Sequence, residues 1–367
     1  MGFVDEMRVK ERRVQEFMER ENLDALALST VANFAWITCG GSNYVGIGTE
    51  VGVAAAVLTR DARYIVCDNI EAPRIRDEEV ADKGFEIVSC PWYQGTRDAL
   101  IRELANGTRI GSDAAMDGAT NISGAFDPCR FSLTSEEVDR YRLLGRSVGE
   151  CVDQTARDIQ PGMTEHEIAG ALDGRLICRG ITPLVSLVAV DDRISRYRHP
   201  IHTDNRLERR AMLVTGARRW GLIVSMTRLV QFGAMPRDAA AKHAAVTRVD
   251  GALISGTVPG ESMSRVFDRA VQIYAETGFG DEWRLHHQGG PTGYKGREFR
   301  VTSETTAAVL PSQAFAWNPS ITGTKSEDTI IAADGGPEVI SAIDGWPMLD
   351  VEIEGKTIPR PDILRRG

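Results

Sequence analysis

Residues 134–172, TSEEVDRYRLLGRSVGECVDQTARDIQPGMTEHEIAGAL, set the architecture of the C-terminal part of this chain. Two Thr-x-x-Glu pairs, beginning at Thr134 and Thr164, have the spacing of capping boxes, in which the two side chains satisfy backbone N–H groups at the start of a helix. The first pair precedes a run with apolar residues at helical spacing, and a Pro-Gly pair ends that run. We therefore expect two consecutive helices joined by a Pro-Gly turn.

The same order of elements returns further along the chain. Residues 239–253 have the pattern of a helix, Val258-Pro259-Gly260 follows, and residues 261–276 place Val266, Ala270 and Ile273 on one helical face. A helix, a Pro-Gly turn and a second helix, seen twice, predict a duplicated α+β domain with pseudo-twofold symmetry.

The N-terminal part has the pattern of a separate α/β domain. Residues 5–20 have helical periodicity, and LDALALS (23–29) has the pattern of a buried strand. Further elements are expected as strands at 51–58, 64–67 and 85–88, a helix in GTRDALIRELA (95–105) and a strand in TRIGSDA near residue 110. The predicted organisation is an N-terminal α/β domain over 1–130, an α+β domain over 131–350 and a C-terminal tail over 351–367.

Composition restricts the possible functions. The 367 residues are 42% hydrophobic and 26% charged, which suits two globular domains, and the net charge of −9 argues against a nucleic-acid partner. No apolar run approaches the length of a membrane helix, and the start MGFVDEMRVKERR is charged, so we expect neither a membrane partner nor a signal peptide and predict a cytoplasmic protein. The six cysteines form no CxxC pair, which removes support for a zinc-knuckle or thioredoxin-like protein.

Several separated motifs together resemble the creatinase, prolidase and aminopeptidase P superfamily. They are NLDALALSTVANFAWITCGG (22–41), the stretch 134–172, HPIHTDNRLERRAMLVTGARRWGLIVSMTR (199–228), LHHQGGPTGY (285–294) and SEDTII (326–331). The resemblance spans nearly the whole chain. It implies a C-terminal pita-bread fold, a creatinase-like N-terminal domain and a homodimer.

The metal site is where the sequence departs from that family. The resemblance implies two divalent ions held by two Asp, one His and two Glu. In this chain the corresponding positions are Val214, Ser225, Gly290, Asn318 and Glu327, so only Glu327 retains a ligand side chain. One carboxylate does not hold two hard cations. We therefore expect no metal or other cofactor, and an Xaa-Pro aminopeptidase mechanism is disfavoured.

Members of the superfamily that lack metals suggest the alternative chemistry. In creatinase and ectoine hydrolase a histidine acts as general base and acid and carboxylates hold the substrate. The resemblance places His199 of YRHPIHTD in the first role and Glu327 in the second, with His202 as a competing register and His286 as the second choice for catalysis. Imidazole titrates near neutral pH, so it can take a proton from water and return it to a leaving nitrogen.

Other side chains are candidates for binding the substrate. They are Asn318, Ser225, Arg198, Trp220 and Tyr294. Arginines are dense around the expected pocket, and because a guanidinium binds a carboxylate through two hydrogen bonds, we expect a substrate that carries a carboxylate.

The leading hypothesis is a metal-independent, creatinase-like hydrolase that cleaves a C–N bond of an amidine, lactam or amide in a small polar molecule. The alternative is a non-catalytic protein that binds a ligand or a peptide in the same cleft. An Xaa-Pro aminopeptidase-like metallopeptidase, or a lyase on the same fold, is the third possibility.

Overall fold

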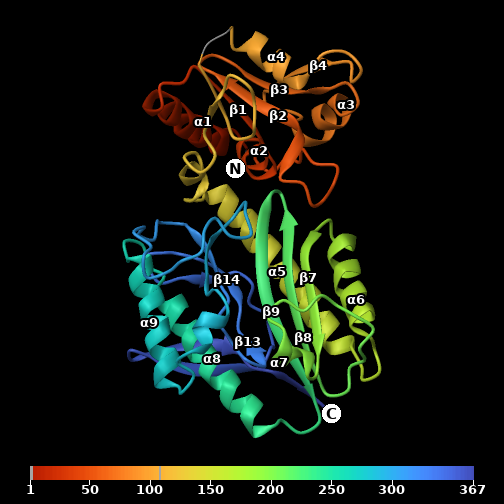
Figure 1. The fold of residues 1–367 in the computed structure, drawn as a ribbon, viewed down its shortest axis with the longest axis vertical. Helices are drawn as coiled ribbons and strands as arrows, with labels where there is room; N and C mark the ends of the chain where they lie inside the picture. Colours follow the sequence, from red (N-terminus) through yellow and green to blue (C-terminus); the bar gives the residue numbers. More distant parts are fainter. Residues whose placement is uncertain (1–2, 107–108) are drawn as a thin grey trace. The chain divides into compact units, whose positions relative to one another are not determined.

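The computed structural model describes residues 3–106 and 109–367, and the chain divides into two compact units. The first unit comprises Met1–Glu137 with Trp220–Leu222, and the second comprises Val138–Arg219 with Ile223–Gly367. Figure 1 shows the elements of both units.

The first unit is built around a six-stranded mixed sheet of order β4-β3-β2-β1-β5-β6. β1 pairs antiparallel with β2 and parallel with β5. Its elements are α1 (Phe3–Arg20), β1 (Ala25–Thr30), α2 (Val31–Ile37), β2 (Val51–Thr59), β3 (Arg63–Asp68), α3 (Ala72–Arg74), η1 (Ile75–Glu79), β4 (Glu86–Cys90), α4 (Arg97–Leu104), β5 (Ile110–Ser112), β6 (Thr120–Asn121) and η2 (Asp127–Arg130). The helices and strands expected from the sequence are present, except that Thr108 of the last predicted strand lies outside the described residues.

The second unit contains two similar halves, each with a pair of helices and a four-stranded sheet. The sheet of the first half has the order β18-β9-β8-β7 and that of the second half β10-β11-β14-β15. The first half contains α5 (Ser135–Asp158), α6 (Glu165–Cys178), β7 (Thr182–Val190), α7 (Arg193–Arg196), β8 (Arg210–Arg219) and β9 (Leu222–Phe232). The second half contains α8 (Arg237–Gly256), α9 (Met263–Glu276), η3 (Glu282–Leu285), β10 (Gly289–Thr292), β11 (Ala314–Trp317), β12 (Ser320–Ile321), β13 (Thr324–Lys325), β14 (Asp328–Ile331) and β15 (Glu338–Val339).

Both predicted capping boxes are confirmed. The backbone N–H of Thr134 donates to Glu137 Oε2 at 2.8 Å and that of Glu137 donates to Thr134 Oγ1 at 3.3 Å. Thr164 and Glu167 make the same reciprocal pair at 2.7 and 3.1 Å. Because each box satisfies two N–H groups that the helix leaves without partners, α5 and α6 begin where the sequence indicates.

Residues 351–367 differ from the predicted tail. They belong to the paired strands β16 (Met348–Ile353) and β17 (Lys356–Pro361) and to β18 (Leu364–Arg366), which pairs parallel with β9. The side chain of Arg360 is buried against Asp250 of α8. The segment is therefore an integral part of the second unit.

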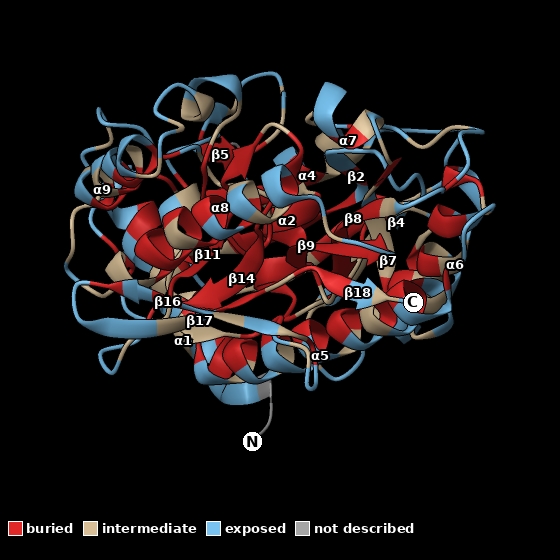
Figure 2. Cartoon of the chain, turned by 90° about the horizontal axis from the view of Figure 1, so that it is seen from below, coloured by how far each residue is buried: buried red, intermediate tan, exposed pale blue. Residues whose placement is uncertain are grey.

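The strands that carry the site lie in the interior. Every residue of β9 and of β14 is buried, and both strands have the buried colour in Figure 2. In the described part of the chain, no helix combines the length and the apolar character needed to cross a bilayer.

Candidate functional site

Three histidines meet in the second unit. His199 follows α7, whereas His286 and His287 lie between η3 and β10. The Nε2 atoms of His199 and His286 are 3.0 Å apart, and the rings of His286 and His287 stack with their centroids 4.4 Å apart. We call these three residues the histidine cluster. The fold thus brings together the first and second candidates for catalysis that were selected from the sequence.

The cluster is held in the neutral state. Burial, and then the charge of Lys325, lower the pKa of His286 to about 3 and also lower the pKa of His199. Burial, followed by Arg297 and Arg300, lowers the pKa of His287 to about 4. Neutral imidazoles keep a lone pair on one ring nitrogen, so each ring can accept a hydrogen bond or bind a metal near neutral pH.

The hydrogen bond within the cluster has a preferred direction. Nδ1 of His286 is buried and has no hydrogen-bond partner among the residues that the structure describes. A buried N–H without a partner costs about 1–3 kcal/mol, so we assign the proton of His286 to Nε2, where it is donated to Nε2 of His199. His199 is exposed, and it is therefore the ring of this pair that can exchange protons with solvent or substrate.

Glu327 lies between β13 and β14, surrounded by cationic and hydroxyl donors. Its Oε2 accepts from Thr227 Oγ1 at 2.7 Å and lies 2.8 Å from Lys325 Nζ, and its Oε1 lies 3.1 Å from Arg297 Nη2. Burial alone would raise the pKa of Glu327, but Lys325 and Arg297 outweigh it and lower the pKa to about 2. We call Arg297, Lys325 and Glu327 the Glu327 triad. It carries a net charge of +1, from two cations and one anion.

This arrangement corrects the role expected for Glu327. Both oxygens of Glu327 already have charged partners, so a cationic group of a substrate would have to compete with Lys325 and Arg297 for the carboxylate. The triad therefore presents positive charge to its surroundings, whereas negative charge was expected there from the sequence.

The former ligand positions do not fit a pair of divalent cations. Val214 packs in an apolar cluster with Ile194 and Met212. Gly290 has a φ of 152°, and a Cβ at this position would lie 2.5 Å from the carbonyl oxygen of Phe299, so no ligand side chain fits there without a backbone shift. The carboxylate of Glu327 is also neutralised by side chains of the protein itself, as described above.

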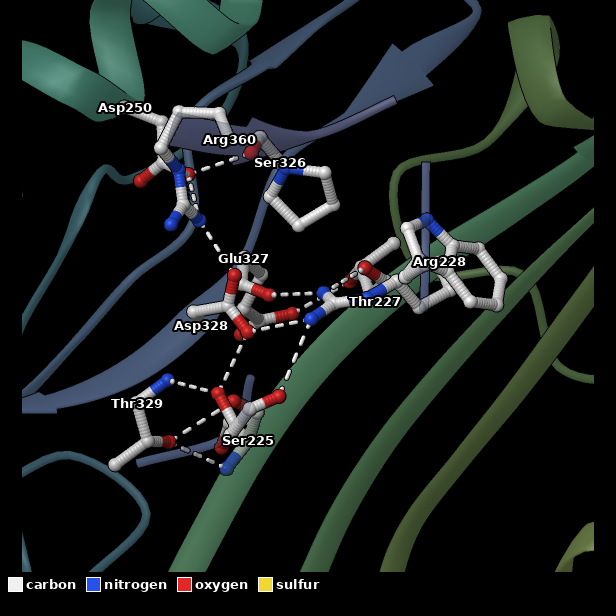
Figure 3. Close-up of polar contacts among 12 residues, drawn as sticks. Ser225, Thr227, Arg228, Asp250, Ser326, Glu327, Asp328, Thr329 and Arg360 are labelled. Atoms are coloured by element: carbon white, nitrogen blue, oxygen red, sulfur yellow. Dashed lines mark hydrogen bonds and ion pairs between the residues drawn. The ribbon is translucent and has the colours of Figure 1, made fainter. Parts of the chain in front are cut away.

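A network of buried charged side chains begins at Asp328, the residue that follows Glu327 (Figure 3). Asp328 accepts from Arg228 Nη2 at 2.8 Å and from Arg360 Nη2 at 2.5 Å. Arg360 Nε also donates to Asp250 Oδ2 at 2.9 Å. All four side chains are at most 1% exposed. The network joins β9, β14, α8 and β17, so it holds in place the start of β14, which Glu327 directly precedes.

Arg198 and His202 have partners other than a substrate. The guanidinium of Arg198 forms an ion pair with Glu282 and donates to Ser320 Oγ and Thr322 Oγ1, each at 3.0 Å. It is therefore committed to the protein, which differs from its expected role in binding a substrate carboxylate. The ring of His202 packs edge-on against His166 at 4.9 Å, so the geometry favours His199 of the two competing registers.

The remaining predicted residues lie at different depths. Ser225 is buried on β9, and its Oγ accepts a long hydrogen bond, 3.5 Å, from Arg297 Nη1 of the Glu327 triad. Asn318 is buried after β11, where its Oδ1 has no partner within the described ranges, and Tyr294 is buried after β10. Trp220 has a φ of 54° in the β8–β9 turn, a segment that groups with the first unit. Ser225 is therefore the best placed of these residues to act together with the triad.

Two basic residues of the site were not predicted. Lys325 stands two residues before Glu327, and in an extended chain residues i and i+2 project to the same side, so this spacing could have indicated the ion pair. Arg300 is exposed, acts on the pKa of His199 and His287, and has no ion-pair or hydrogen-bond partner among the described residues. It follows β10 in an irregular segment, where sequence periodicity gives no information about side-chain direction.

The duplicated second unit with this site defines a pita-bread protein, and comparison with known proteins supplies the family. The model of metallopeptidase family M24 matches residues 139–337, and that of the creatinase/prolidase N-terminal domain matches residues 11–144. The chain belongs to metallopeptidase family M24.

Relatives of the chain resemble it over nearly their whole length. An uncharacterized peptidase of Staphylococcus aureus is 22% identical over 84% of this chain and 95% of its own. An Xaa-Pro dipeptidase of Pyrococcus horikoshii is 20% identical over 91% of this chain and 97% of its own. The solved structure of an Xaa-Pro dipeptidase from Bacillus anthracis covers 98% of this chain and 100% of its own, with a TM-score of 0.79 and 17% identity. These similarities confirm the predicted superfamily and fold.

Proposed function

We propose that this chain is a hydrolase that cleaves a C–N bond in a small, carboxylate-bearing molecule without a resident pair of metal ions. The observation that carries the proposal is the 3.0 Å contact between Nε2 of His199 and Nε2 of His286 beside the positively charged Glu327 triad. Amidines, lactams and amides are the substrate classes.

The histidine cluster supplies the acid and base. A water molecule that replaces His286 as the hydrogen-bond donor to Nε2 of His199 gives a proton to that nitrogen, and the resulting hydroxide attacks the carbon of the C–N bond. As that bond breaks, the imidazolium returns the proton to the departing nitrogen, so that one water is consumed and His199 is regenerated. General acid–base catalysis of this kind contributes about 100- to 10,000-fold to a rate. Until that water binds, His286 keeps the ring of His199 oriented through their hydrogen bond.

The Glu327 triad supplies electrostatic stabilisation. Attack on an amide or lactam places negative charge on the former carbonyl oxygen, and a preorganised positive charge in a buried site stabilises it. Lys325 is close enough to lower the pKa of both His199 and His286, so its charge also acts on a substrate held at these rings. Removing one such group from an active site costs about 100- to 1,000-fold in rate.

Arg300 is the proposed anchor for the substrate carboxylate. It takes over the role expected for Arg198, because its guanidinium is exposed, near the cluster, and without a charged partner in residues 3–106 and 109–367. A fork of N–H donors suits a carboxylate through two parallel hydrogen bonds.

The test is a substrate screen with protein that has been treated with EDTA and desalted. Cyclic amidines, lactams, N-acyl amino acids and dipeptides with proline second are offered to wild type, His199→Ala and the matched control His202→Ala. We expect turnover by wild type and by the control, and a loss of at least about 100-fold in His199→Ala, from the removal of the base. Full activity of His199→Ala, or activity that appears only when manganese or cobalt is added, contradicts the proposal.

A second candidate is a non-catalytic protein that binds a carboxylate-bearing ligand or peptide in the same place. It is favoured by the loss of ligand side chains at Val214 and Gly290, which removes the chemistry of the metallopeptidases. No turnover in the screen, together with ligand binding that Arg300→Gln abolishes, would favour this candidate over the hydrolase.

A further inference from the structure

We infer that the histidine cluster is a binding site for one zinc-type divalent cation, at a position distinct from the ligand positions of the family. In the described residues it is the one group of three or more histidine, cysteine or acidic side chains whose ligand atoms all lie within 4.8 Å of one another. All three members contribute imidazole nitrogen.

The spacing of the nitrogens suits a tetrahedral ion. With Zn–N bonds of about 2.0–2.1 Å and tetrahedral angles, two ligand nitrogens stand about 3.3 Å apart. The Nε2 atoms of His199 and His286 are 3.0 Å apart, so two of the three ligands need to separate by only a few tenths of an ångström. The ring of His287 is stacked on that of His286 at 4.4 Å, and its ligand atom lies within 4.8 Å of the other two, so it has to move closer to them to complete the set.

The ligand chemistry selects the metal. Neutral imidazole suits zinc, copper and nickel, whereas manganese, magnesium and calcium prefer carboxylate and carbonyl oxygen, which this cluster does not contain. Each ring binds a metal through the lone pair of one nitrogen. The proton that His286 holds on Nε2 must move to Nδ1, which lowers the affinity.

The surrounding charge favours a metal that carries an anion. A dication in the cluster is repelled by the positive charges of Lys325, Arg297 and Arg300 and is attracted by the negative charge of Glu327. His199 is exposed, so the fourth coordination position is open to water, hydroxide or a carboxylate. An anion bound there is attracted both by the metal and by the three cationic side chains, and we therefore expect zinc to bind together with such an anion.

Zinc at this site would inhibit the hydrolysis proposed above. This consequence rests on the proposed function, because the metal would take the lone pair with which His199 accepts a proton. Zinc binding itself does not depend on turnover, so the two proposals fail in different experiments.

The experiment is calorimetric titration of zinc chloride into EDTA-treated, desalted protein at about pH 7. We expect about one zinc per chain at micromolar or tighter affinity, at least about tenfold weaker binding in His199→Ala and in His286→Ala, and wild-type binding in the matched control His202→Ala. Titration with manganese should give no comparable binding. Cobalt in place of zinc should give the visible absorption of a tetrahedral nitrogen site.

Absence of zinc binding by wild type up to about 100 µM, which is about 100-fold or about 2.7 kcal/mol weaker than a micromolar site, overturns the inference. So does zinc binding that His199→Ala and His286→Ala leave unchanged. A protein that binds zinc through these histidines but hydrolyses nothing retains this inference and loses the proposed function.

Discussion

Replacing Glu327 with glutamine should destabilise the second unit by about 3 kcal/mol at neutral pH. The pKa of this carboxyl falls from an ordinary 4.5 to about 2 in the folded protein, because Lys325 and Arg297 outweigh the effect of burial. Lowering a carboxyl pKa by one corresponds to about 1.4 kcal/mol of preferential stabilisation of the ionised form. Glu327 is only 3% exposed, so screening by water is small.

The effect has a definite dependence on pH. A carboxyl whose pKa is lowered by folding contributes its stability above the unfolded-state value and loses it as the pH falls toward the folded value. The difference between wild type and Glu327→Gln should therefore be constant from about pH 7 to pH 5.5, shrink by about 0.8 kcal/mol at pH 4 and shrink by about 2 kcal/mol at pH 3.

Urea unfolding of both proteins at these pH values, followed by circular dichroism, measures the difference. Glu338→Gln is the matched control, since Glu338 pairs with Arg142 at the surface, where both side chains are more than 40% exposed. An exposed pair contributes at most about 1 kcal/mol. A Glu327→Gln protein as stable as this control, or a difference that persists unchanged to about pH 3, would refute the reasoning about the triad.

The other predictions concern the buried network, the former ligand position and the histidines. Arg360→Met should cost about 3 kcal/mol or more in urea unfolding, because it leaves buried Asp250 without its cation and Asp328 with Arg228 alone, and a loss below about 1 kcal/mol would contradict this. Gly290→Ala should cost about 1–3 kcal/mol, seen as a lower melting temperature, because its Cβ meets the carbonyl of Phe299; an unchanged melting temperature would show that the backbone yields freely. Activity should persist below about pH 6.5 because the pKa of His199 is lowered, and Lys325→Met should shift the acidic limb of the pH–rate profile to higher pH; an acidic limb that stays in place in Lys325→Met would exclude this electrostatic coupling.

Local signals explain why most of the fold could be predicted from the sequence. The capping boxes at Thr134 and Thr164 are contacts between neighbours three residues apart, and the apolar stripes of the helices depend only on their own periodicity. The C-terminal strands were missed because their partners are remote: β18 pairs with β9, more than one hundred residues earlier. A short segment without a motif gives no local sign of such pairing.

The candidate site was predicted in part. His199 and His286 were selected through a family resemblance, and the structure brings them into contact. A negative charge was expected at Glu327, whereas the triad around it is positively charged. Which cations reach a carboxylate depends on how irregular segments fold, and the sequence pattern does not show this. Arg297 approaches Glu327 from such a segment, 30 residues earlier in the chain.

The burial of Arg360 and the pairing of β18 also determine when the second unit can form. On a growing chain, β9 and Asp250 leave the ribosome long before Arg360 and Leu364, so until synthesis is almost complete the first sheet lacks an edge strand and Asp250 lacks the cation with which it pairs. The first unit has most of its contacts within Met1–Glu137 and can begin to fold during translation. Nascent chains stalled shortly before Arg360 should therefore hold a folded first unit beside a protease-sensitive second one.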